Sequence, residues 1–136
     1  MTDSLDYESR IDITMHRMHR ADVALKEAEC LASNSMFSGA VNRLYYACYY
    51  AVSALLLAND IQAVTHSGVK TMFGLKFVRT GKVELCHGKF FSEIFDQRHS
   101  SDYDDFSFCD DTTFSEFHPK AVDLIKAIKD LIDKTI

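Results

Sequence analysis

Apolar residues recur every three to four positions along most of the chain, which is the spacing of one face of an α-helix. A first helix is predicted over about residues 5–33, and it ends where Asn34 and Ser35 interrupt the pattern. A last helix is predicted to end near Lys134. The apolar stripe of this last helix consists of Ala121, Ile125, Ile128 and Ile132.

The segment over about residues 36–59 has a different pattern, because its apolar residues cover more than one face. A helix that is apolar nearly all round is typical of the centre of a bundle. The single charge between Ala40 and Ala58 is Arg43. An unpaired charge in such a helix is costly, so Arg43 is predicted to pair with a carboxylate, for example Asp102 or Glu93, or to lie at the lip of a pocket.

Two shorter helices are predicted between these segments. The first runs to about residue 80, with Ser67 as a plausible N-cap and Gly81 as the residue that follows its end. The second covers about residues 83–102, and the acidic, aromatic stretch at 103–111 is predicted to be a loop.

The start of the last helix stays open at this point. Thr113 followed by Glu116 fits a capping box, whereas Pro119 fits a position in the first turn of a helix. The two signals cannot mark the same start.

The fold class follows from these elements and from the scarcity of turn residues. The chain of 136 residues contains 5 glycines and 1 proline, which favours a few long elements with short connections. We therefore expect an all-α, up-and-down bundle of four to five helices. A chain of this length is predicted to be one domain, residues 1–136.

Charge and cysteine content narrow the function classes. The net charge of −5 argues against non-specific nucleic-acid binding by a basic surface, although it says nothing about a local basic patch. The polar, acidic N-terminus and apolar runs shorter than the about 20 residues of a membrane span favour a cytoplasmic protein with no membrane partner. The cysteines are not spaced for metal binding, and the sequence has no P-loop and no Rossmann glycine pattern, so no metal and no cofactor is expected. The four, expected to be reduced and mostly buried, are Cys30, Cys48, Cys86 and Cys109.

The strongest candidate for chemistry is the segment from Arg98 to Tyr103. In a helix, Arg98 and Asp102 are i,i+4 neighbours, and His99 lies one step round. Arg98 can bind a phosphate with two hydrogen bonds, and His99 can titrate near neutrality. The alternative is purely structural, because basic residues complement a helix C-terminus and Arg98 with Asp102 can form a surface ion pair.

Two further candidates are binding positions. Arg43 beside Tyr46 can build a polar pocket inside a bundle, or it can serve a structural ion pair alone. His66, between Thr65 and Ser67, lies where a helix N-terminus can receive an anion, and simple capping is the alternative.

Several motifs, in this order and spacing, resemble the HEPN domain family. They are the runs GAVNRLYYA from Gly39, THSGV from Thr65, FVRTG from Phe77 and RHSSDYD from Arg98. The similarity covers most of the chain, from about residue 24 to 132, and is closest to the small stand-alone prokaryotic members.

The resemblance implies a helical bundle, usually a homodimer, that often works beside a small nucleotidyltransferase in a toxin–antitoxin pair. Active members are metal-independent ribonucleases with a motif of an arginine, a polar residue and, a few residues later, a histidine. Arg98 matches the arginine and His99 the polar residue, while Tyr103 stands in the place of the histidine.

Two function hypotheses follow from the replaced histidine. The first is a dimeric module that binds a nucleotide or RNA, or docks a nucleotidyltransferase, with a degenerate ribonuclease motif. The alternative is a ribonuclease toxin that uses Arg98, His99 and Tyr103. The resemblance also allows a third role for Tyr103, as the acceptor of an AMP group.

Overall fold

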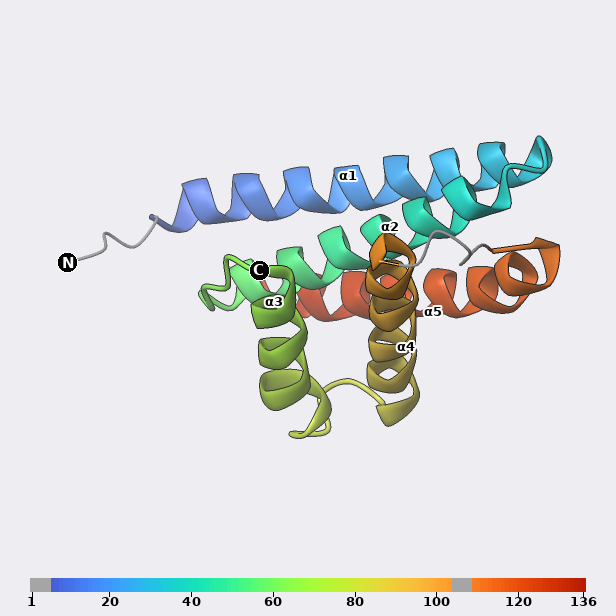
Figure 1. The fold of residues 1–136 in the computed structure, drawn as a ribbon. Coiled ribbons are helices and arrows are strands. Elements are labelled where there is room, and N and C mark those ends of the chain that lie inside the picture. The colour runs from blue at the N-terminus through green and yellow to red at the C-terminus, as the bar shows by residue number, and fades with distance from the viewer. Residues whose placement is uncertain (1–5, 104–108) are drawn as a thin grey trace.

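The computed structural model describes residues 6–103 and 109–136, and for residues 100–103 it describes the backbone alone. This part of the chain contains five α-helices, one π-helical turn and no strand. The predicted all-α bundle is confirmed (Figure 1).

Helices α1 (Tyr7–Ser33) and α2 (Phe37–Ala58) form an antiparallel pair joined by a short turn. The side chain of Asp6 caps α1 by accepting a hydrogen bond from the Ser9 backbone N–H at 2.7 Å. Ser35, in the turn, has a φ of 59°. The predicted ranges of both helices are confirmed to within two residues, because periodicity and turn residues are local signals.

The core is centred on α2, which packs against α1 on one side and against α5 (Asp111–Thr135) on another. Small residues on α1 let the two backbones approach closely, and they are fully buried: Ala21, Ala24 and Ala28. The apolar stripe of α5 predicted from the sequence is buried against this core. The central position predicted for the second helix is therefore confirmed.

Helices α3 (His66–Phe73) and α4 (Leu85–Tyr103) run steeply across the direction of α1 and α5 (Figure 1). A π-helical turn, η1 (Gly74–Val78), continues α3 toward the turn at Gly81, whose φ is 80°. A Cβ atom added at Gly88 would lie 2.8 Å from both methyl carbons of Val78, so α4 and η1 are in close contact there. This contact fixes how α3 and α4 sit relative to each other.

Two helix starts differ from the signals that the sequence offered. Thr65, not Ser67, caps α3, and its hydroxyl accepts from the Gly68 N–H at 2.9 Å. The last helix begins at Asp111, because the Asp110 carboxylate accepts from the Thr113 N–H at 3.0 Å and provides an earlier cap than either signal considered.

Pro119 therefore lies inside α5 rather than in its first turn. The predicted loop 103–111 is shorter at both ends, because Tyr103 belongs to α4 and Asp111 to α5, and residues 104–108 lie outside the described residues.

The prediction for the cysteines holds only in part. Cys48 and Cys109 are buried, whereas Cys30 and Cys86 are exposed at positions on the outer faces of α1 and α4. None of the four forms a disulfide. Burial raises the pKa of the Cys48 thiol, so this side chain is an inert apolar core residue.

Candidate functional site

Four tyrosines on α2 form the floor of the candidate site. They are Tyr45, Tyr46, Tyr49 and Tyr50, and i,i+4 spacing places Tyr45 with Tyr49 and Tyr46 with Tyr50. Tyr45 is fully buried, while the other three are half-buried. Tyrosine suits this boundary because its ring packs against apolar groups while its hydroxyl needs a polar partner.

His66, the first residue of α3, lies directly on this floor. Its Nδ1 is 2.7 Å from the hydroxyl of Tyr45, and its ring stacks on Tyr49 with the centroids 4.2 Å apart. Burial lowers the pKa of His66, and the proximity of His99 and Arg98 lowers it further. His66 is therefore neutral at pH 7.

The C-terminal part of α4 brings His99 to the same place. Its ring stacks on Phe95 at 4.1 Å and stands perpendicular to the ring of His66, with the two centroids 6.0 Å apart. The Nε2 atom of His99 is buried and has no hydrogen-bond partner among the described residues. Buried polar atoms are nearly always hydrogen-bonded, so a ligand or a second chain can supply the hydrogen-bond partner that this atom lacks.

Two arginines converge on Tyr46 from different helices. Arg98, from α4, places its guanidinium carbon 5.6 Å from the centre of the Tyr46 ring, and its Nη2 donates to the Tyr46 hydroxyl at 3.4 Å. Arg43, from α2 itself, lies 5.5 Å from the same ring. Both distances suit a cation–π contact.

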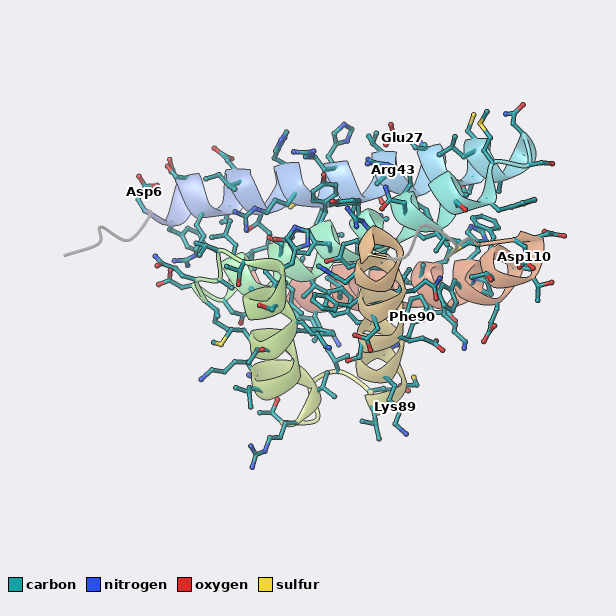
Figure 2. The ribbon with its side chains drawn as sticks, viewed as in Figure 1. Asp6, Glu27, Arg43, Lys89, Phe90 and Asp110 are labelled. Atoms are coloured by element: carbon teal, nitrogen blue, oxygen red, sulfur yellow. The ribbon has the colours of Figure 1, made fainter. Side chains whose placement is uncertain are left out.

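Arg43 is paired with a carboxylate, as predicted, but the partner is different. Its Nη2 donates to Glu27 Oε1 at 2.8 Å, across the contact between α1 and α2 (Figure 2). The examples Asp102 and Glu93 were wrong, because the register of α1 on α2 decides which carboxylate comes within reach. The Nε atom of Arg43 is also buried without a hydrogen-bond partner among the described residues.

The structure therefore brings together five of the seven residues singled out in the sequence. They are Arg43, Tyr46, His66, Arg98 and His99. The backbones of the other two, Asp102 and Tyr103, form the last turn of α4, and their side chains lie outside the described residues. The predicted pair of Arg98 with Asp102 lies outside them as well.

Two functional positions were missed in the sequence. Tyr45 positions His66 through its hydroxyl, and Tyr49 supports the imidazole ring. Their hydroxyls at i,i+4 in an otherwise apolar helix were the available signal, because a buried tyrosine needs a partner from another element.

The cluster offers two guanidinium groups, two imidazoles and half-buried tyrosine rings in one place. Such a set can hold a phosphate and the aromatic base next to it. Among the described residues, no group of three His, Cys, Asp or Glu side chains is arranged to hold a metal ion. Within the same residues, no helix has the length and apolarity required to cross a membrane.

Comparison with known proteins gives a consistent assignment. A family model described as the HEPN domain matches residues 14–133. A protein of Thermotoga maritima named "UPF0332 protein" is 40% identical over 114 residues, which cover 84% of this chain and 86% of the relative.

Two proteins of Methanocaldococcus jannaschii, each named as a candidate toxin, are similar as well. One is 33% identical over 87 residues, covering 64% of this chain and 59% of the relative. The other is 36% identical over 83 residues, covering 61% and 62%. The family model spans nearly the whole bundle, and this chain is accordingly a member of the HEPN domain family.

Proposed function

We propose that the protein is a dimeric HEPN module that binds RNA or a nucleotide at the cluster around Tyr46. The observation that carries this proposal is the convergence of two guanidinium groups, Arg43 and Arg98, at 5.5 and 5.6 Å from one half-buried tyrosine ring. A guanidinium binds phosphate through two hydrogen bonds, and a tyrosine ring stacks on a base. The buried, unbonded Nε atom of Arg43 supports the same idea, because a bound phosphate supplies the missing acceptor.

The proposal is a binding module rather than an enzyme because of Tyr103. An ordinary tyrosine has a pKa near 10, so at neutral pH it neither takes up nor releases protons readily. Tyr103 replaces the histidine that handles protons in the ribonucleases that this chain resembles. We propose that the module acts in the cytoplasm as the partner of a small nucleotidyltransferase, a role consistent with relatives named as candidate toxins.

A metal-independent ribonuclease toxin is the second candidate, and one observation favours it. His66 and His99 face each other at 6.0 Å beside Arg98, and the lowered pKa of His66 keeps it able to accept a proton. RNA cleavage requires a base that removes the proton of the 2′-hydroxyl while its oxygen attacks phosphorus. It also requires an acid that protonates the departing 5′-oxygen, and two imidazoles can share these roles.

One experiment separates the two candidates. Purified protein is mixed with fluorescently labelled RNA in EDTA, and both binding anisotropy and cleavage are measured for the wild type, Arg98→Ala, His66→Ala and Tyr103→His. A binding module binds RNA without cleaving it, loses at least tenfold in affinity with Arg98→Ala, and gains cleavage with Tyr103→His. Cleavage by the wild type that disappears in both Arg98→Ala and His66→Ala would establish the ribonuclease instead.

The dimer is tested separately by sedimentation velocity at micromolar concentration. A single species of twice the chain mass of 15.5 kDa is expected. A monomer at every concentration would contradict the dimeric part of the proposal and leave the binding part to the RNA measurement.

A further inference from the structure

The arginines of this protein are distributed very unevenly. The chain has six; one of them belongs to α2, and three others donate hydrogen bonds to side chains of α2. Arg43 and Arg98 lie at Tyr46, as described above. The other two reach α2 from α1, and neither belongs to the cluster around Tyr46.

Arg20 and Arg17 continue the polar side of α2 away from that cluster. Arg20 donates to the Tyr50 hydroxyl at 2.7 Å, and its guanidinium carbon lies 4.4 Å from the ring centre. Arg17 donates to the Ser53 hydroxyl at 2.9 Å. We call the set Tyr46, Tyr50, Ser53, Arg20 and Arg17 the arginine–tyrosine row.

The row is straight because of helix geometry. Tyr46, Tyr50 and Ser53 are at i, i+4 and i+7, so they fall on one face of α2 and span about 10 Å along its axis. Because α1 is antiparallel to α2, its residues Arg20 and Arg17 meet that face in the matching order. The row therefore runs from Tyr46 toward the C-terminal end of α2.

A small cavity lies at the far end of the row. It has a volume of about 200 Å³, and its walls combine Arg17 and Ser53 with Leu56, Leu57 and Gln62. This is below the roughly 300 Å³ at which pockets for whole small molecules begin. A cavity of this size, with apolar walls and a few polar groups, suits one planar base.

The charge of the row is available to a ligand. Arg43 is neutralised in part by Glu27, but neither Arg17 nor Arg20 forms an ion pair with a carboxylate in the part of the chain that the structure describes. Arg20 is exposed, and Tyr50 is half-buried. The row is thus the local basic surface that a net charge of −5 does not exclude.

We propose that the arginine–tyrosine row binds single-stranded RNA that extends from the cluster around Tyr46. Arg17 and Arg20 bind successive phosphates, a base stacks on Tyr50, and the next base enters the cavity beside Ser53. A single strand is required because bases held in a duplex do not expose their faces to tyrosine rings. This inference rests on the proposed function, since it extends the same site.

The test compares RNA of different lengths and strandedness at one salt concentration. Labelled trinucleotide RNA, a single-stranded 12-mer (roughly the span of such single-strand sites) and its duplex are titrated by fluorescence anisotropy. We expect the single-stranded 12-mer to bind more tightly than the trinucleotide and more tightly than the duplex. The double variant R17A/R20A should lose about tenfold in affinity for the 12-mer and leave the trinucleotide unchanged. The slope of log affinity against log salt should become less steep by about 1.4, because two phosphate contacts worth about 0.7 each on a single strand are lost.

Two controls make the result specific. Arg79→Ala removes the same charge at the end of η1, away from the row, and should change the affinity less than twofold. The Arg20 side chain is exposed, so the single variant Arg20→Ala should fold and keeps the test valid if the double variant does not. It should lose roughly threefold for the 12-mer, and far-UV circular dichroism confirms the fold of each variant.

The failures of the two proposals are distinguishable. If no RNA of any length binds, or if Arg98→Ala leaves binding unchanged, the proposed function is wrong. RNA binding by the arginine–tyrosine row is then refuted as well. If Arg98→Ala weakens binding to both lengths while Arg20→Ala and R17A/R20A behave like Arg79→Ala, the site stands and only the row is refuted. Equal affinity for the duplex and the single strand would also overturn the row.

Discussion

Replacing Gly88 with alanine tests the close contact between α4 and η1 that sets the position of the site helices. The new Cβ atom would lie 2.8 Å from both methyl carbons of Val78 and 3.3 Å from its Cβ atom. Because both methyls branch from one carbon, rotation of the Val78 side chain cannot relieve both contacts at once.

The magnitude follows from two opposing effects. Overpacking of this kind costs roughly 1–3 kcal/mol, and the better helix propensity of alanine returns up to about 1 kcal/mol. We expect the free energy of unfolding to fall by roughly 1–2 kcal/mol and Tm to fall by roughly 3–8 °C. Urea denaturation followed by far-UV circular dichroism measures this change, at one fixed protein concentration because the stability of the proposed dimer would depend on that concentration.

Matched variants show whether the cause is the contact itself. Gly74→Ala adds the same methyl group in η1, where nothing lies within 4 Å, and should be neutral or stabilising by up to about 1 kcal/mol. In the double variant with Val78→Ala, the two effects should be coupled by about 1 kcal/mol. A Gly88→Ala protein as stable as the wild type, with no coupling to Val78→Ala, would refute the reasoning.

Three other predictions concern the site. The free energy of unfolding should decrease as pH falls below about 6.5, because the unfolded chain binds the proton that folded His66 resists, and His66→Gln should reduce this slope in urea titrations at several pH values. Tyr45→Phe should cost about 1–2 kcal/mol in the same assay, since it leaves the Nδ1 atom of His66 without its 2.7 Å partner, and an unchanged midpoint would contradict this. Glu27→Gln should change stability by less than about 1 kcal/mol but raise RNA affinity a few-fold in anisotropy titrations, because the charge of Arg43 becomes free for phosphate. A weaker affinity would instead show that Glu27 orients Arg43 for binding.

Helix boundaries are predictable from the sequence where the signal that sets them lies within the helix or next to it. The ranges of α1 and α2 were predictable because the apolar period and the turn at Asn34 lie within the segments themselves. The start of α5 was not, because Asp110 provides a cap upstream of every signal considered and the helix accommodates Pro119 in its interior.

The candidate site shows the same difference between local signals and contacts set by packing. Arg43 was recognisable as a charge in need of a carboxylate, but Glu27 became its partner through the register of two helices, which no local pattern specifies. The contact of His66 with Tyr45 joins residues 21 positions apart in different elements. A sequence thus indicates which residues can carry chemistry, whereas the contacts of those residues depend on how the helices pack.

The three-residue connection between α1 and α2 has a consequence for how the protein folds. Contacts between helices that are neighbours in the chain close small loops and form early, whereas α5 must return to α2 from the far end of the chain. The first helical pair already carries Arg17, Arg20, Arg43 and the four tyrosines, so we expect this part of the proposed RNA-binding surface to form before α3 and α4 dock. We expect amide hydrogens of α4 to exchange faster than those of α2, and bound RNA to slow them selectively.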